Sequence, residues 1–367
     1  MLHKTFFYTM AALFFLIPAA AGFTGAPAAD RSSAPGPKQE QIRAFIYHHF
    51  GMEDQYPSTS VSVDQFKDHL DYLDTHDYTV LTLGQALDRL FSEKGVSEKT
   101  AVISIDDGYR SVWDNALPLL EKYGYPATIF IATAYVGGDN YLSWDQIQQL
   151  RKKGFEIGNH SHGHAYFLNK PKEEIADAFE ADLKKSHAQF RRHLGHVPEL
   201  YAYPAGEYSP EMADVLKKYD YRAGAAQKSG VIHRGGDRFA LPRFPMNVNY
   251  AEMESFEEKI GMNALEVTKA DPESPLVTPK NNPPALELHI RKNKINPDGL
   301  QCFVSGEKDC KMEISEKNKE LVVEVRADDA LTSRRTLYTL TAPSKDGSEW
   351  FWYSHSWVIP EKKPPQQ

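Results

Sequence analysis

The stretch 101–115 reads AVISIDDGYRSVWDN. Its mostly apolar first half ends on two adjacent aspartates, Asp106 and Asp107, which Gly108 follows. A short apolar run that stops at a turn signal is typical of a buried strand in a parallel sheet. The sequence therefore predicts a buried strand whose carboxyl end carries two negative charges.

Similar β-rich runs recur up to about residue 250 and alternate with helical patterns. The expected strands are 43–49, 78–83, 101–106, 127–132, 155–160, 200–204, 221–226 and 239–244, and the expected helices are 62–76, 111–124, 143–154 and 172–195. Alternation at this spacing predicts an α/β fold with a parallel sheet. Seven or eight units favour a deformed (β/α) barrel of about seven strands over 42–265. An open doubly wound sheet is the alternative.

The pattern changes after Met262. Residues 266–283 are rich in Pro, Asn and Ser and predict a linker. Short strands without helices follow, which predicts a small antiparallel, sandwich-like β domain over 284–360. Its segment 350–357, WFWYSHSW, is rich in aromatic residues. We expect this segment to pack against the barrel, and an exposed sugar-binding strip is the alternative.

The N-terminus has the layout of a secretory signal peptide. Lys4 precedes an apolar run, and Ala19–Ala21 offers a cleavage site, so we expect a signal peptide over 1–21. The Pro/Ala/Ser-rich segment 22–41 predicts a disordered leader. We therefore expect an exported protein, periplasmic or extracellular, with no transmembrane segment in the mature chain.

Composition and the two cysteines indicate which class of protein this is and which partners it is expected to have. The chain has 367 residues, 41% hydrophobic and 25% charged, with a net charge of −8, which is ordinary for a globular protein. A negative net charge argues against a nucleic-acid partner, and we expect a monomer. In an exported protein, the close pair Cys302 and Cys310 predicts one disulfide.

Polar residues follow several of the expected strands at the point where each strand ends. They are His48, His49, Asp106, Asp107, His160, Tyr203, Pro204 and Arg243. Active sites of parallel α/β barrels lie at the carboxyl ends of the strands. A single histidine or an Asp-Gly pair has an ordinary structural explanation. Recurrence at equivalent strand ends favours a functional site.

The segment 156–164, EIGNHSHGH, supplies two histidines four residues apart, His160 and His164. If a helix follows the strand, both side chains share one face. Two imidazoles and one carboxylate form a three-ligand set for a divalent metal with open positions. Either Asp106 or Asp107 would be the third ligand, and the other would take a proton from metal-activated water. His162 is expected to point elsewhere.

Three segments carry a family resemblance: SIDDGY at 104–109, NHSHGH at 159–164 and YAYPAGEYS at 201–209. They resemble the polysaccharide deacetylase family, the NodB-homology domain of carbohydrate esterase family four. Segments 44–51 and 60–87 resemble its exported branch, which deacetylates poly-N-acetylglucosamine. The likeness covers about 42–246.

The resemblance implies a deformed (β/α) barrel with a divalent metal held by Asp107, His160 and His164. Zinc is the expected metal, with cobalt and nickel as alternatives. The resemblance also implies that Asp106 is the catalytic base. The backbone N–H of Ala205 would stabilise the developing oxyanion.

This sequence departs from the family pattern in two places. Many members carry an arginine two residues before Pro204 to hold the catalytic aspartate, but that position is Ala202 here. We expect Arg243 to replace it. No clean Leu-x-x-His setting for the family's general acid is present, and His233 lies in a Gly-rich loop. We expect His48 to be the acid instead, with His49 pointing away or lining the rim.

Trp144, Tyr203 and Pro204 are also candidates for substrate contact. Trp144 either lies beside a sugar ring or anchors its helix on the barrel. Tyr203, next to Pro204, either lines the acetyl pocket or packs beneath it.

The predicted function is metal-dependent hydrolytic N-deacetylation of an N-acetylglucosamine-containing polysaccharide, with release of acetate. One alternative is another Asp/His metallohydrolase, such as a phosphoesterase, which usually uses paired metals or more Lys and Arg. The other is a glycan-binding module that has lost activity. The presence of both aspartates and both histidines argues against that module.

Overall fold

The computed structural model describes residues 40–93, 95–292, 294–306 and 310–361. These residues belong to one compact unit, Gly36–Gln367. The predicted signal peptide and all but the last two residues of the predicted leader lie outside the described residues. Among the residues that are described, no helix has the length and apolar character needed to cross a membrane.

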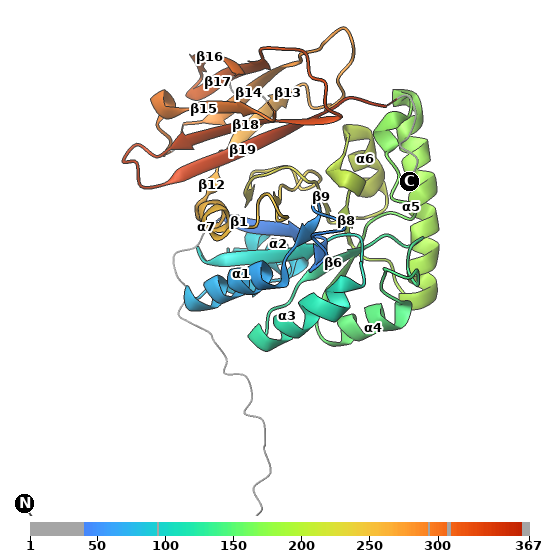
Figure 1. Cartoon of the computed structure of the whole chain (residues 1–367). Coiled ribbons are helices and arrows are strands. Elements are labelled where there is room, and N and C mark those ends of the chain that lie inside the picture. Colours follow the sequence, from blue (N-terminus) through green and yellow to red (C-terminus); the bar gives the residue numbers. More distant parts are fainter. Residues whose placement is uncertain (1–39, 94, 293, 307–309, 362–367) are drawn as a thin grey trace, which may run out of the picture. The chain divides into compact units, whose positions relative to one another are not determined.

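A curled sheet forms the frame of the first part of the described chain (Figure 1). Its strand order is β10-β1-β5-β6-β7-β8-β9, with β4 paired to β5 and β11 paired to β1. The strands are β1 (Gln41–Tyr47), β4 (Thr79–Leu81), β5 (Thr100–Ile105), β6 (Thr128–Ile131), β7 (Glu156–Asn159), β8 (Leu200–Ala202), β9 (Ala223–Ala225), β10 (Ile232–His233) and β11 (Phe244–Pro245). The pairing of β1 with β10 is antiparallel, and the other pairings are parallel.

The segment 241–245 connects the two sides of the curl. Leu241 bridges Ala225 at the end of β9, while β11 pairs with β1. This closure confirms the deformed barrel over the open doubly wound sheet. The strand expected over 239–244 was wrong in extent, because Pro242 has no N–H to donate to a ladder and only Phe244–Pro245 forms a strand.

Helices lie along the outside of the sheet (Figure 1). The predicted ones are α1 (Val63–Thr75), α3 (Leu117–Tyr123), α4 (Trp144–Lys152) and α5 (Lys172–Leu194). The prediction missed α2 (Leu83–Phe91), α6 (Pro210–Lys218) and α7 (Met253–Gly261). A π-helical turn, η1 (Val112–Ala116), leads into α3.

Local chemistry explains where the helices begin and end. The hydroxyls of Ser62, Thr82 and Ser143 each accept a hydrogen bond from the third residue of their helix, in capping boxes. Gly124 and Gly195 end α3 and α5 in the left-handed conformation, which glycine adopts without steric cost. Both glycines end their helices where the sequence predicts.

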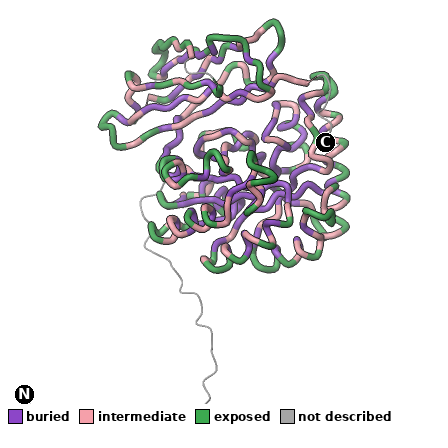
Figure 2. Tube along the Cα trace, viewed as in Figure 1, coloured by how far each residue is buried: buried purple, intermediate pink, exposed green. Residues whose placement is uncertain are grey.

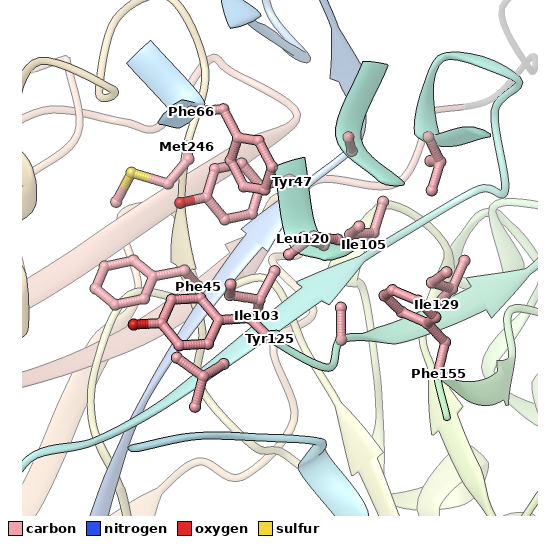
Figure 3. Packing of buried hydrophobic residues seen from close by; sticks show 14 of the residues in the cluster. Phe45, Tyr47, Phe66, Ile103, Ile105, Leu120, Tyr125, Ile129, Phe155 and Met246 are labelled. Atoms are coloured by element: carbon pink, nitrogen blue, oxygen red, sulfur yellow. The ribbon is translucent and has the colours of Figure 1, made fainter. Parts of the chain in front are cut away.

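The core lies between the strands and the inner faces of the helices (Figure 3). Phe45 and Tyr47 of β1, Ile103 and Ile105 of β5, and Phe66 of α1 are each at most 1% exposed. In the barrel, burial follows the strands, and exposure follows the outer faces of the helices (Figure 2). Strands covered on both faces explain the continuous apolar runs of the sequence.

The C-terminal part forms two four-stranded sheets, in the orders β12-β19-β18-β15 and β13-β14-β17-β16. The strands are β12 (Asn263–Ala264), β13 (Val267–Asp271), β14 (Ala285–Arg291), β15 (Gln301–Val304), β16 (Cys310–Lys317), β17 (Glu320–Ala327), β18 (Arg335–Pro343) and β19 (Trp350–Val358). All pairings are antiparallel except that of β12 with β19. The predicted antiparallel β region is confirmed. The domain boundaries stay a prediction, and β13 lies inside the segment expected to be a linker.

Two details of this region bear on the predictions. Cys302 and Cys310 form the predicted disulfide, with their Cα atoms 6.0 Å apart. Trp352 of β19 contacts Phe244 edge to face, with ring centroids 5.7 Å apart, and Trp357 is buried. These contacts favour packing as the role of the aromatic strand.

Candidate active site

The two aspartates lie at the carboxyl end of β5. The backbone N–H of Asp106 donates to the Tyr47 carbonyl, which extends the pairing of β5 with β1. Asp107 and Gly108 then adopt φ angles of 70° and 74°. A side chain on Gly108 would place its Cβ 2.8 Å from the Ile131 side chain. This tight left-handed turn keeps both carboxylates at the strand end.

One oxygen of Asp107 faces two imidazoles. Asp107 Oδ1 lies 3.1 Å from His160 Nε2 and 3.3 Å from His164 Nε2, and one ligand atom of each of these residues lies within 4.8 Å of the others. Ligands about 2.0–2.1 Å from a tetrahedral ion are about 3.3 Å apart. The three residues therefore fit a divalent metal ion.

The contacts of His160 and Asp107 show which atoms could bind a metal. His160 Nδ1 lies 2.8 Å from the Ala202 carbonyl, which can only accept, so Nδ1 carries a hydrogen and Nε2 is the nitrogen that would ligate a metal. Burial raises the pKa of Asp107, but its hydrogen bond to His160 and the nearby imidazole charges outweigh burial and hold that pKa far below its usual range. Asp107 is thus a carboxylate.

The two histidines do not share a helix face, because the condition for it, a helix directly after β7, is not met. The residues that directly follow β7 form a loop rather than a helix. Ser161 and His164 both have left-handed φ angles, 73° and 49°. The Ser161 hydroxyl accepts from the His164 backbone N–H at 2.9 Å. This turn, rather than a helical repeat, returns His164 to the side of His160.

Asp182 of α5 holds this loop from outside. Its two carboxylate oxygens accept from the backbone N–H groups of His162 at 2.7 Å and Gly163 at 2.9 Å. The His162 ring lies 3.0 Å from the Thr133 hydroxyl, and His162 is not part of the Asp107, His160 and His164 cluster. Asp182 is a positioning residue that the sequence analysis missed.

Arg243 binds Asp106 through both guanidinium nitrogens. The distances are 2.7 Å from Nη1 to Oδ1 and 2.8 Å from Nη2 to Oδ2. Arg243 also donates to the Ala226 carbonyl and the Ser104 hydroxyl, and it is fully buried. Burial raises the pKa of Asp106, but the charges of Arg243, His160 and His48 and the hydrogen bonds from Arg243 together outweigh burial, and the net pKa is lowered. Arg243 thus lies where the sequence analysis expected a partner for Asp106.

The two histidines that follow β1, His48 and His49, have different surroundings. His48 is half-buried at the break before β2 (His49–Phe50). Burial lowers the pKa of His48, while the nearby charges of Asp107 and Asp106 raise it in part. The His49 ring stacks between Tyr56 and Tyr109, with centroid distances of 4.3 Å and 3.6 Å. His49 is therefore packed between two tyrosines and buried, and it is not part of the Asp107, His160 and His164 cluster.

Ala205 lies in a left-handed turn after β8, inside η3 (Pro204–Gly206), with φ 52° and ψ 12°. Gly206 follows with φ 69°, and a Cβ there would lie 2.4 Å from the Gln227 backbone nitrogen. The Ala205 carbonyl accepts a hydrogen bond from Arg335. The turn is rigidly packed, as an oxyanion-binding N–H requires.

Packing contacts account for two of the three substrate candidates. Tyr203 is fully buried, and its hydroxyl donates to the Phe239 carbonyl at 2.9 Å; Pro204 is also buried. Trp144 stacks on His193 of α5 with ring centroids 4.4 Å apart. These contacts favour the packing alternative for Tyr203 and Trp144.

Comparisons with known proteins agree with this arrangement. The family model for polysaccharide deacetylase matches residues 93–224. A poly-beta-1,6-N-acetyl-D-glucosamine N-deacetylase of Staphylococcus aureus (strain MRSA252) is 30% identical over 217 residues, which cover 56% of this chain and 74% of the relative. The putative polysaccharide deacetylase YxkH of Bacillus subtilis (strain 168) is 29% identical over 206 residues, 56% of this chain and 71% of that protein.

Solved structures share the fold. A Streptococcus pyogenes deacetylase, PplD, in complex with acetate superposes with a TM-score of 0.54 at 19% identity, over 60% of this chain and 98% of that one. IcaB from Ammonifex degensii gives a TM-score of 0.53 at 23% identity, over 59% and 97%. Taken with the family match and the staphylococcal relative, the chain belongs to the polysaccharide deacetylase family, whose members are hydrolases of N-acetyl amide bonds.

Proposed function

We propose that the protein is a metal-dependent N-deacetylase of an N-acetylglucosamine-containing polysaccharide and releases acetate. The observation that carries the proposal is the single Asp107 oxygen that faces both His160 Nε2 and His164 Nε2, next to the Asp106–Arg243 pair. The staphylococcal relative's name supports poly-β-1,6-N-acetylglucosamine as the first substrate to test.

Asp107, His160 and His164 would hold the metal, and zinc suits this set of one oxygen and two nitrogen ligands, with cobalt and nickel as alternatives. A divalent ion bound there supplies Lewis-acid chemistry, because it lowers the pKa of water and polarises a carbonyl. Asp107 brings the negative charge that favours a cation in this buried position.

Asp106 is proposed to act as the base. Its lowered pKa keeps it ionised at neutral pH, and Arg243 fixes both of its oxygens. It would accept the proton of the attacking water, after which the water oxygen forms a bond to the acetyl carbon. Arg243 is a positioning residue that acts through Asp106.

Two more groups complete the proposed reaction. The N–H of Ala205 would donate to the acetyl oxygen as it gains negative charge. His48 would protonate the leaving amine as the C–N bond breaks. Burial lowers the pKa of His48, and the nearby charges of Asp107 and Asp106 offset that lowering only in part. The presence of Asp106, Asp107, His160 and His164 in one cluster supports an active enzyme over a module that has lost activity.

We also propose that the protein works outside the cytoplasm. The signal-peptide pattern over 1–21 supports this location. The Cys302–Cys310 disulfide agrees with it, because disulfides persist in oxidising compartments.

Acetate release from a panel of purified glycans tests the function: a β-1,6-linked N-acetylglucosamine pentamer, a chitin pentamer and peptidoglycan. We expect release from at least one of them, with the β-1,6-linked pentamer first. His164→Ala should abolish release, whereas His162→Ala, in the same loop but outside the cluster, should retain it. Equal activity of these two variants would contradict the site, and no release from any N-acetylated glycan would contradict the function.

A further inference from the structure

Two adjacent arginines of the C-terminal β region, which runs from β12 to β19, contact barrel segments next to the proposed site. Arg334 directly precedes β18, and Arg335 is the first residue of that strand. The Arg334 carbonyl accepts from the Ile359 backbone N–H at 2.8 Å, and Arg335 pairs with Val358 of β19. The backbone of both arginines is therefore fixed in the β region.

Arg334 forms an ion pair through two nitrogens with Glu207, which lies two residues after Ala205. Its Nε donates to Glu207 Oε1 at 2.8 Å, and its Nη2 donates to Oε2 at 2.7 Å. The Glu207 side chain is 3% exposed, and that of Arg334 is 17% exposed. Because little water reaches these two side chains, the pair holds its geometry more firmly than an exposed ion pair does.

Arg335 contacts the turn itself. It donates to the carbonyl oxygen of Ala205, and its Nη1 also lies 3.4 Å from the Gln227 side-chain oxygen. Ala205 has a left-handed φ of 52°, and a residue with a side chain keeps such a conformation only where its surroundings hold it. Arg335 therefore fixes the peptide group between Ala205 and Gly206, directly after the N–H proposed to bind the oxyanion.

The Arg334 side chain also reaches the segment that follows His164. Its Nη1 donates to Asn169 Oδ1 at 2.7 Å, and its guanidinium carbon lies 4.4 Å from the centre of the Tyr166 ring. Tyr166 and Asn169 come two and five residues after the proposed ligand His164. One side chain of the β region thus joins the segment after a metal ligand to the turn that contains Ala205.

We propose that Arg334 and Arg335 are positioning residues for deacetylation, an inference that rests on the proposed function. They act through the turn of Ala205, whose N–H would donate to the acetyl oxygen as that oxygen gains negative charge. A displacement of about 1 Å in such a group can lower the rate about a hundredfold. The C-terminal β region is then part of the catalytic unit rather than a separate glycan-binding module.

The alternative is that these contacts only join the barrel to the β region, and another contact between the two provides the comparison. Asn263 of β12 accepts from Arg43 Nη2 at 3.0 Å. Arg43 lies near the amino end of β1 and pairs with Ala101 near the start of β5. Asn263 is 8% exposed, so its contact is buried as well. Asn263→Ala therefore removes a buried contact between the same two regions, away from the carboxyl ends of the strands.

The first test is the steady-state kinetics of acetate release from the β-1,6-linked pentamer at saturating zinc. We expect Arg334→Met and Arg335→Met each to lower kcat about 10–100-fold with an unchanged KM, because the lost contacts act in the transition state. A contact that only joined the two regions would leave the kcat of the folded protein unchanged. Asn263→Ala should therefore keep the kcat of the wild type.

A second variant keeps the test valid if the unpaired Glu207 carboxylate unfolds the Arg334→Met protein. Arg334→Met combined with Glu207→Gln leaves neither charge at this contact, and the same loss of kcat is expected. A wild-type kcat in this double variant or in Arg335→Met would overturn the role of the arginine that is missing. An equal loss of kcat in Asn263→Ala would overturn both roles.

Hydrogen exchange followed by mass spectrometry tests the turn without relying on turnover. The backbone N–H groups of Gly206 and Glu207 donate to carbonyls within the turn, at 2.8 Å and 3.1 Å, so their exchange reports whether the turn stays closed. In a peptide covering 203–208, we expect these amides to exchange about tenfold faster in the double variant and like the wild type in Asn263→Ala. Unchanged exchange in the double variant would overturn the hold of Arg334 on the turn.

The two proposals fail in different ways. If the wild type releases no acetate from any glycan, the proposed function fails, and hydrogen exchange still shows whether Arg334 holds the turn. If acetate is released and the arginine variants keep the kcat of the wild type, the function stands and the positioning role fails.

Discussion

Replacing Arg243 with methionine should destabilise the metal-free protein by about 3–5 kcal/mol, the usual cost of removing one partner from a buried ion pair. The structure favours a loss near the upper limit of this range. Both oxygens of Asp106 are bound, at 2.7 Å and 2.8 Å, and Arg243 is 0% exposed while Asp106 is 2% exposed. Methionine would leave a buried carboxylate without its cation. Urea denaturation followed by circular dichroism measures the free energy of unfolding.

A double-mutant cycle isolates the pair. Asp106→Asn removes the orphaned charge, so Arg243→Met combined with Asp106→Asn should cost less than the sum of the two single changes, by up to about 3 kcal/mol. Arg222→Met is the control, because Arg222 pairs with the exposed Asp88 and should cost less than about 1 kcal/mol. Equal losses for Arg243→Met and Arg222→Met, or an additive double mutant, would refute the reasoning.

Three further predictions concern other parts of the chain. Asp182→Ala removes the two backbone contacts of the histidine loop, so calorimetry should find zinc affinity about 10–100-fold lower; unchanged affinity would contradict its positioning role. Burial lowers the pKa of His355 to about 3. The unfolded state therefore binds one more proton than the folded state below about pH 6.5, and the free energy of unfolding decreases as the pH is lowered. His355→Phe should flatten that loss between pH 6.5 and 4 by up to about 1.4 kcal/mol per pH unit in urea unfolding; an unaltered slope would exclude His355. Changing Cys302 and Cys310 to serine should cost about 2–3 kcal/mol, and a smaller change than about 0.5 kcal/mol would show that the disulfide is dispensable.

Local patterns in the sequence were enough to predict the ends of several elements. Apolar runs marked β5, β6 and β7, and the capping residues Ser62 and Ser143 marked two helix starts. The reason is that strand burial and helix capping depend on neighbours within a few residues. The strand expected over 239–244 is shorter because Pro242 has no N–H to donate to a ladder, and its pairing with β1 joins segments that lie far apart in the sequence.

For the candidate site, too, the sequence predicted the features that depend on local motifs and missed those that depend on the fold. The residue types and motifs indicated Asp107, His160 and His164, but the path of the chain after β7 was left open, and it is a turn in which Ser161 and His164 adopt left-handed conformations. Such conformations are set by contacts with the rest of the fold. Asp182 lies 20 residues after His162 in the sequence. The one signal for Asp182 in the sequence is that this acidic residue directly precedes Leu183, which lies on the buried face of α5.

The contacting rings of Tyr56, His49, Tyr109 and Tyr141 show the same limit. Tyr109 lay inside a quoted motif, yet nothing local relates it to Tyr56 or Tyr141. These residues come from loops after three neighbouring strands, β1, β5 and β6, and the strand order brings them together. Only the fold shows that they form one stack.

The metal dependence of acetate release tests the central claim most directly. The protein is stripped with a chelator, and zinc is returned in steps while acetate release from the β-1,6-linked pentamer is followed. We expect activity to disappear on stripping and to return fully at one equivalent of zinc per chain, and Asp107→Asn should recover little at that ratio. Full activity after stripping, or equal recovery by Asp107→Asn, would contradict a catalytic metal held by Asp107, His160 and His164.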